Sequence, residues 1–302
     1  MPKSKFYKKY IRPINNTIAY WLLSILIFIF RLLPQKFAIW FGGILAIIAY
    51  PFAFKSRRII KRNIEIMVSN GYDLPRNLGL KNFKESGRNL VRIFRVSKDL
   101  PKGKLNIEFS GREIFDKYYQ DGKGVIVLTG HIGPFEYIPA YIGSLDYKVS
   151  VIGRQLFDSR VDKILVQSRN EFGTVNIPSD SSAMKLIRLL RDGYSLGILA
   201  DVNTRRVAYS YAEFFKREER TVTGPVSLAR IVGLPLIPMA IYPKGLTDFE
   251  IVCLEPIEIP KTNDKDNDIA IGLKLMNITL EKLIMQMPEN WMWYHPRFRD
   301  KR

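Results

Sequence analysis

Short apolar runs rich in β-branched residues alternate with helix-like patterns from about residue 60 to the end of the chain. Runs of this kind are typical of buried strands, and apolar residues spaced three or four apart are typical of amphipathic helices. The strands expected on this basis are 125–129, 149–153, 173–177, 196–200, 236–241 and 249–254, and the helices expected are 77–97, 134–144, 158–172, 180–192, 221–233 and 268–287. The alternation predicts an α/β fold with a central mixed sheet flanked by helices.

Two apolar segments, 18–30 and 37–54, precede the α/β region. A bilayer span needs about 20 apolar residues, so the first is short and the second is close to that length. Basic residues flank both segments, namely Lys3, Lys5, Lys8, Lys9 and Arg12 before the first and Arg57, Arg58, Lys61 and Arg62 after the second. We expect residues 1–56 to form a basic N-terminus with hydrophobic membrane-anchor helices, and residues 57–302 to form the α/β domain. The alternative is a pair of buried helices that cover this domain; a signal peptide is disfavoured because no small-residue cleavage site follows.

The chain carries 47 Lys and Arg against 29 Asp and Glu, a net charge of +18. This charge favours a polyanionic neighbour, which is a nucleic acid, an anionic membrane surface or an acidic carrier protein. The single cysteine, Cys253, excludes an internal disulfide and lies in a strand-like run, so a buried core residue is expected. The two histidines, His131 and His295, are too far apart in the sequence to indicate a zinc site, and no metal is expected.

The stretch from Gly130 to Glu136 places His131 at the carboxyl end of an expected strand, just before a Gly133-Pro134 turn. Such a turn lets His131 face Glu136 on the first turn of the next helix. A histidine held by a carboxylate is a general base for a hydroxyl group. The alternative is that His131 is an ordinary strand-end residue and that Glu136 complements the helix dipole. Asp201 follows another expected strand at the same edge of the sheet.

The motif Gly-His-Ile-Gly-Pro-Phe-Glu, residues 130–136, resembles the His-x4-Glu/Asp block of glycerolipid and lipid A acyltransferases, especially the lauroyl/myristoyl-type lipid A branch. The resemblance extends over nearly the whole chain. Its further blocks are 151–155, 168–173, 198–201, 214–215, 223–225 and 233–238, with an ending at 288–298 similar to Pro-x-x-Trp-x-Trp-x-His-x-Arg. Pro134 and Val202 depart from the commonest form, which has Asn and Gln there, and they leave the acceptor open.

This resemblance implies a glycerolipid acyltransferase-like fold in which His131 deprotonates an acceptor hydroxyl, Glu136 orients His131, and the hydroxyl attacks an acyl thioester directly. It further implies that Arg154 and Arg169 bind acceptor phosphate or stabilise developing negative charge, and that Asp201 holds an arginine or an acceptor group. The acyl donor is expected to be acyl carrier protein or coenzyme A, used as a co-substrate, with no resident cofactor. The acceptor would be a lipid A precursor or related membrane lipid. The enzyme would work at the bacterial inner membrane with its catalytic domain on the cytoplasmic side.

Two other functions remain open from the residues. A thioesterase or lipid hydrolase would use the same His131–Glu136 pair to activate water. The other hypothesis is a basic, non-enzymatic protein that binds nucleic acid at the membrane surface. Only the net charge supports this hypothesis, and no nucleic-acid partner is expected. Three C-terminal and loop features are assigned no catalysis. His295 is expected to be structural, and 216–220 is expected to be a solvated loop. The third feature is a set of aromatic residues that would form an interfacial belt or a nucleic-acid stacking platform, or would dock on the core: Trp291, Trp293, Tyr294 and Phe298.

Overall fold

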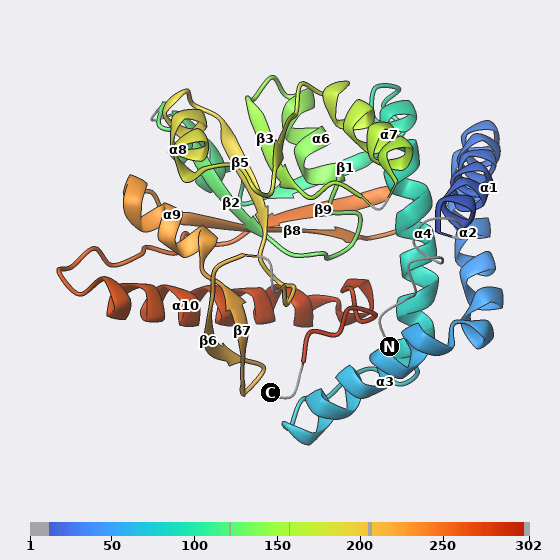
Figure 1. Cartoon of the computed structure of the whole chain (residues 1–302). Helices are drawn as coiled ribbons and strands as arrows, with labels where there is room; N and C mark the ends of the chain where they lie inside the picture. The colour runs from blue at the N-terminus through green and yellow to red at the C-terminus, as the bar shows by residue number, and fades with distance from the viewer. Residues whose placement is uncertain (1–11, 121, 157, 205–206, 299–302) are drawn as a thin grey trace.

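The computed structural model describes residues 12–120, 122–156, 158–204 and 207–298, and its centre is a seven-stranded sheet (Figure 1). The strand order is β1-β9-β8-β2-β5-β3-β4. Neighbouring strands are parallel except for β8 and β9, which are antiparallel, so the predicted mixed sheet is confirmed. The strands are β1 (Asn106–Ser110), β2 (Val125–Thr129), β3 (Val149–Gly153), β4 (Val175–Pro178), β5 (Ser195–Leu199), β8 (Leu236–Pro243) and β9 (Asp248–Cys253).

Helices cover both faces of the sheet, as the alternating side chains of β2 show. Val125 and Val127 pack in a core with α5 and α6, whereas Ile126 and Leu128 pack in a second core with α8, α9 and α10. The helices of this region are α5 (Arg112–Gln120), α6 (Tyr137–Ser144), α7 (Ser159–Asn170), α8 (Ala183–Arg191), α9 (Gly224–Val232) and α10 (Lys265–Gln286). A sheet buried on both faces explains why its strands read as continuous apolar runs.

A two-stranded hairpin of β6 (Tyr209–Phe214) and β7 (Arg217–Val222) replaces the solvated loop expected at 216–220, so that prediction is wrong. Phe215 and Lys216 both have positive φ and form the turn, as a tight hairpin with matching twist requires. The mixed charges of this segment are compatible with a packed strand, because the buried carboxylate is paired. Glu219 is 2% exposed and lies 2.8 Å from Nε of Arg217. Strand β1 and helix α5 were also absent from the sequence-based expectation.

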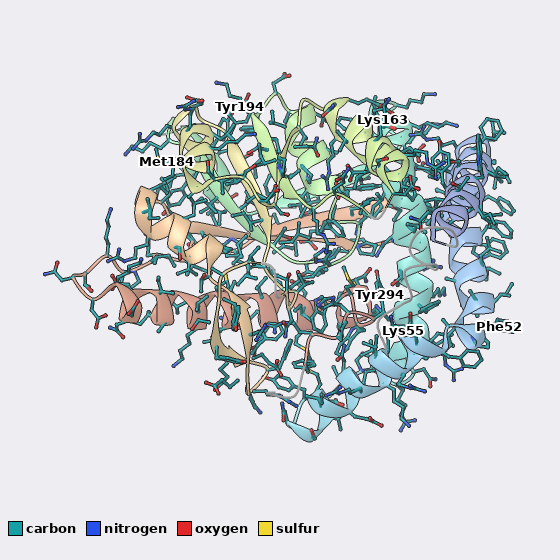
Figure 2. The ribbon with its side chains drawn as sticks, in the orientation of Figure 1. Phe52, Lys55, Lys163, Met184, Tyr194 and Tyr294 are labelled. Atoms are coloured by element: carbon teal, nitrogen blue, oxygen red, sulfur yellow. The ribbon has the colours of Figure 1, made fainter. Side chains whose placement is uncertain are left out.

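The N-terminal helices lie beyond one end of the sheet, where α1 (Arg12–Leu32) and α2 (Gln35–Ala49) pack against the long helix α4 (Leu78–Asp99). The short helix η2 (Tyr50–Phe52) and helix α3 (Phe54–Ser69) connect them to α4. Gly87 allows the close approach of α2 and α4, since a Cβ there would lie 2.5 Å from the Gly42 carbonyl oxygen. Phe52 projects outward at this edge of the molecule (Figure 2).

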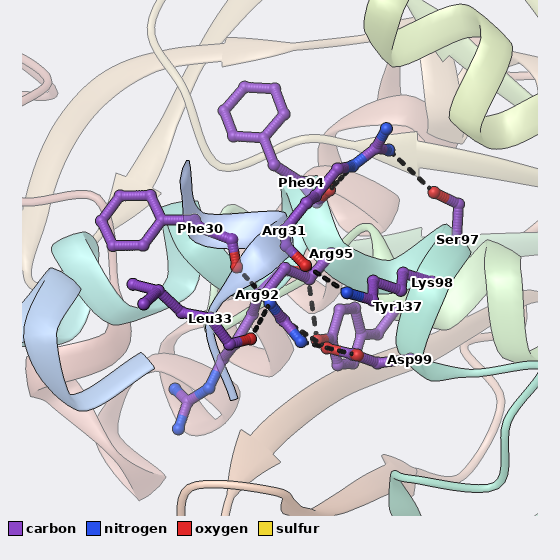
Figure 3. Close-up of polar contacts among 10 residues, drawn as sticks. All are labelled: Phe30, Arg31, Leu33, Arg92, Phe94, Arg95, Ser97, Lys98, Asp99 and Tyr137. Atoms are coloured by element: carbon purple, nitrogen blue, oxygen red, sulfur yellow. Dashed lines mark hydrogen bonds and ion pairs between the residues drawn. The ribbon is translucent and has the colours of Figure 1, made fainter. Parts of the chain in front are cut away.

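Charged side chains of α4 hold the end of α1 in place (Figure 3). Arg95 is 1% exposed, binds both carboxylate oxygens of Asp99 at 2.7 and 2.9 Å, and donates to the carbonyls of Phe30 and Leu33. Lys98 donates to the carbonyl of Arg31, whose own side chain returns hydrogen bonds to α4 at Phe94 and Ser97. The final carbonyls of a helix lack partners within it, and cations are favoured there. Helix α1 is therefore fixed to α4.

One helical segment of the described chain, Gln35–Phe52, is long and apolar enough to cross a membrane, and the apolar helix Asn16–Leu32 is shorter. Lys3, Lys5, Lys8 and Lys9 lie outside the described residues. The expected domain boundary after residue 56 falls within α3. The role of residues 1–56 as a separate anchor stays a prediction.

Candidate active site

His131 and Asp201 meet at the carboxyl ends of β2 and β5, which are adjacent and parallel. Thr129 pairs with Leu199 in the sheet, so the residues two positions further along each strand emerge side by side. Gly130 permits this approach, because a Cβ there would lie 3.1 Å from Cγ of Asp201. The expected convergence of these residues is confirmed.

The Asp201 carboxylate is the hydrogen-bond partner of the His131 ring. Nδ1 of His131 lies 2.8 Å from Oδ1 of Asp201, and the backbone N–H of His131 donates to Oδ2 at 2.9 Å. The indole Nε1–H of Trp291 also donates to Oδ2, at 2.9 Å. Burial raises the pKa of Asp201, but the charge of His131 and the hydrogen bonds from His131 and Trp291 outweigh burial and lower that pKa to about 2. An ionised Asp201 keeps the proton of a neutral His131 on Nδ1 and leaves Nε2 free to accept one.

Glu136 has a different partner from the expected one. Its carboxylate accepts hydrogen bonds from Nε and Nη2 of Arg169 at 2.8 and 2.5 Å, and no hydrogen bond joins it to His131 among the described residues. The expectation that Glu136 orients His131 is therefore corrected. Between the two residues Gly133 adopts a φ of 60°, and Phe135 packs edge-on against the His131 ring with the ring centroids 5.1 Å apart. This turn directs Glu136 away from His131 and towards α7.

The two arginines of the expected site differ in their surroundings. Arg169, in the last turn of α7, is 14% exposed in its side chain and also donates to Asn176 at 2.8 Å. Arg154 follows β3 directly and is exposed. The structure thus brings Arg169 to Glu136, and Arg154 is exposed next to Gly153, where an added Cβ would lie 3.0 Å from Nη1 of Arg169. A binding role for either arginine stays a prediction.

Two cavities adjoin the site, and Phe135 lines both. The first contains His131, which is 22% exposed in its side chain, and is otherwise lined by α4 and the C-terminal segment through Ser86, Asn89, Leu90, Ile93, Asn290, Trp291, Met292 and Tyr294. The second lies between α6 and the sheet and contains the Glu136–Arg169 pair. Its other walls are mostly apolar and include Val127, Ile138, Ile142, Val149, Val151 and Leu199. His131 and the Glu136–Arg169 pair therefore face two different cavities, and Phe135 lines both.

Trp291 is the site residue that the sequence did not indicate. The contact with Asp201 spans 90 positions of the chain, and no local spacing encodes it. Three of the four aromatic residues of the C-terminal segment dock on the core, since Trp291, Trp293 and Phe298 are at most 2% exposed, whereas Tyr294 is 39% exposed. His295 lies 3.2 Å from the carbonyl of Asn203 through its Nε2 atom.

Groups that would support other chemistry are not assembled in the described part of the chain. It contains no cluster of three or more His, Cys, Asp or Glu side chains that could hold a metal ion. Cys253 is buried in β9, where burial raises the pKa of its thiol to about 12 and keeps it protonated.

Comparison with known proteins gives matches that cover between 82% and 99% of the chain. A family model described as bacterial lipid A biosynthesis acyltransferase matches residues 4–300. A lipid A biosynthesis palmitoleoyltransferase of Escherichia coli (strain K12) is 20% identical over 99% of this chain and 96% of its own length. A lipid A biosynthesis lauroyltransferase of the same organism is 23% identical over 84% of this chain and 82% of its own. A crystal structure of the 1-acyl-sn-glycerophosphate acyltransferase PlsC from Thermotoga maritima covers 82% of this chain and 97% of that chain, with 14% identity and a TM-score of 0.38.

Proposed function

Since this chain belongs to the bacterial lipid A biosynthesis acyltransferase family and is an acyltransferase, we propose that it moves a fatty acyl chain from an acyl thioester to a hydroxyl group of a lipid A precursor or a related membrane lipid. One observation carries the proposal. A histidine whose Nδ1 atom is held by a buried, ionised aspartate faces a cavity at the carboxyl edge of the sheet. That arrangement is suited to removing a proton from a bound hydroxyl group.

The reaction needs no covalent acyl-enzyme. Nε2 of His131 takes the proton of the acceptor hydroxyl, and the oxygen attacks the thioester carbonyl carbon to form a tetrahedral intermediate. The intermediate collapses with cleavage of the carbon–sulfur bond, and the leaving thiolate takes the proton from His131. Asp201 stabilises the imidazolium that forms between these steps. The ester and the free thiol are the products.

We assign Glu136 the task of holding Arg169 rather than His131. A guanidinium bound by two parallel hydrogen bonds keeps a fixed orientation, and its positive charge stabilises nearby negative charge. Arg169 lies with Glu136 in the apolar cavity, next to Phe135 and hence next to the His131 cavity. It is therefore suited to the developing oxyanion or to a phosphate of either substrate.

The two cavities suit the two substrates. The walls between α6 and the sheet are apolar, and the space between them is about 30 Å³, so this cavity suits only the first part of the donor's acyl chain. The cavity around His131 includes Ser86, Asn89 and Asn290, which can hydrogen-bond a polar acceptor. Phe135 then lies where the thioester meets the hydroxyl. The proposed donor is acyl carrier protein or coenzyme A.

Membrane association is part of the proposal and is supported by an apolar N-terminal surface. We give this name to the exposed apolar side chains Ile18, Trp21, Leu22, Ile25, Phe28, Ile29, Leu32, Phe37, Trp40, Ile48, Phe52 and Phe54. Exposed basic residues adjoin it at Lys36, Lys55, Arg57, Arg58 and Lys61. Large apolar patches with a basic border are typical of proteins on anionic membranes. We place the enzyme at the bacterial inner membrane with its catalytic domain on the cytoplasmic side.

The test uses the purified full-length protein and its His131→Gln variant. Lauroyl-acyl carrier protein and lauroyl-coenzyme A are supplied separately, with a lipid A precursor that lacks one acyl chain, and the lipids are analysed by mass spectrometry. We expect a mass gain of one acyl chain with one or both donors, and a loss of at least about a hundredfold in rate in the variant. Release of free fatty acid without acceptor would favour the hydrolase instead, and equal rates for the two proteins would remove His131 as the base.

A further inference from the structure

We propose that Trp291 is a positioning residue for acyl transfer, because its indole N–H fixes the Asp201 carboxylate that holds His131. The inference rests on the proposed function of His131 as the base. Trp291 would not touch the reacting atoms; it would act on them through Asp201. This role differs from that of a core aromatic residue, which contributes only packing.

Among the hydrogen-bond donors to the Asp201 carboxylate, Trp291 differs from the others in where it lies in the chain. Two of the three hydrogen bonds described for this carboxylate come from His131 itself, through Nδ1 and the backbone N–H. These bonds hold Asp201 and His131 to each other. The indole of Trp291 is the donor from a different part of the chain, so it ties the pair to the rest of the molecule. The bond between Trp291 and Asp201 is shielded from water, since Asp201 is 1% exposed and Trp291 is 2% exposed.

Trp291 is itself held firmly. Its carbonyl accepts a hydrogen bond from Asn82 of α4 at 2.6 Å, and Asn82 also binds the carbonyl of Glu289 at 2.9 Å. Its indole packs edge-on against Trp293 with the ring centroids 4.9 Å apart. Trp291 also forms a β-bridge with Ile132, the residue after His131. A donor that is held in place in this way fixes the direction in which the Asp201 carboxylate points.

The test compares Trp291→Phe with Trp293→Phe. Each variant keeps an aromatic ring and loses one buried indole hydrogen bond, because Nε1 of Trp293 donates to the carbonyl of Pro288 at 2.6 Å. Each variant therefore replaces one buried indole by a smaller ring and loses one indole hydrogen bond, to a carboxylate for Trp291 and to a backbone carbonyl for Trp293. Only Trp291→Phe removes a donor from Asp201. Similar melting temperatures for the two variants would show that both fold.

The first readout is the tautomer of His131, measured by 15N NMR on protein labelled at histidine. The chain has two histidines, so His131→Gln assigns the two sets of signals. At alkaline pH, with neutral imidazole, we expect the wild type and Trp293→Phe to carry the proton on Nδ1. We expect Trp291→Phe to show a measurable share of the tautomer protonated on Nε2, which is inactive as a base. This readout requires no substrate.

The second readout is steady-state acyl transfer from lauroyl-acyl carrier protein or lauroyl-coenzyme A. We expect Trp291→Phe to lower kcat about tenfold with KM within about twofold, because the missing hydrogen bond orients the Asp201–His131 pair for the chemical step and is not itself a bond to substrate. Trp293→Phe should keep kcat within about twofold. A wild-type tautomer in Trp291→Phe, or equal loss of kcat in both variants, would overturn the positioning role. Absence of transfer by every protein, wild type included, would instead refute the proposed function, and the tautomer would still decide the inference.

Discussion

At the scale of single residues, the two carboxylates of the site have separate tasks that substitution should resolve. Asp201→Asn removes the charge opposite the imidazolium and presents an amide that can favour the wrong tautomer of His131. We expect kcat to fall by about a thousandfold or more, as for the comparable aspartate of serine proteases. Glu136→Gln leaves His131 with Asp201 and weakens the hold on Arg169, so its kcat should fall less. The kinetic constants of both variants check this, and a larger loss in Glu136→Gln would restore Glu136 as the partner of His131.

Asp201 should also contribute to the acid sensitivity of the fold. Its pKa in the folded protein is about 2, below the usual value for an unfolded chain of about 3.9. A carboxylate with a lowered pKa stabilises the fold at pH values above the pKa that it has in the unfolded chain. This contribution is lost as the pH falls through the pKa that it has in the folded protein. We expect about 2–3 kcal/mol of unfolding free energy to be lost from this group between about pH 5 and pH 2. Denaturant unfolding across that range should show a flatter pH profile for Asp201→Asn than for the wild type.

At the scale of secondary-structure elements, the sequence predicted the buried core better than its edges. The run at 125–129 was found because a strand buried on both faces is apolar throughout. The strands β6 and β7 were missed because their alternation mixes charged and aromatic residues, and only the packed structure shows that Glu219 is buried. His131 and Asp201 were placed at the correct edge by topology. The partner of His131 was not predictable, since it depends on the backbone of Gly133 and on Trp291, far along the chain.

Helix α4 joins the N-terminal helices to the site, and the contact with α1 can be tested through Arg95. Arg95→Met leaves Asp99 buried without its charged partner, and removal of one member of a buried pair costs about 3–5 kcal/mol. Arg112→Met is the control, because its pair with Asp116 is largely exposed and should contribute at most about 1 kcal/mol. Chemical unfolding should therefore show a large difference between the two variants. The double change Arg95→Met with Asp99→Leu should recover most of the loss, and failure to do so would mean that the hydrogen bonds to α1 dominate.

At the scale of the whole molecule, the proposed function gives the net charge of +18 and the apolar N-terminal surface separate tasks in bringing the enzyme to a membrane. If the protein works at a membrane as we propose, its charge should draw it to anionic lipid at a distance, and this attraction should weaken as salt screens it. The apolar N-terminal surface should act only on contact and should respond little to screening by salt. Because α1 is fixed to α4, docking of this surface on a bilayer would also fix the direction in which the active site faces the lipid.

Substitution of Phe52 by Ser should separate these two contributions. Phe52 is 74% exposed, so its loss should leave the fold intact, whereas burial of such a side chain in lipid is worth about 1.5–3 kcal/mol. We expect binding to vesicles of phosphatidylglycerol and phosphatidylcholine to weaken about tenfold or more, at low and at high salt alike. Met184→Ser is the control, since Met184 is 69% exposed on the opposite side of the molecule (Figure 2) and should not touch lipid. Equal flotation of the two variants would mean that the apolar N-terminal surface does not contact the membrane, and that charge alone brings the enzyme to its acceptor.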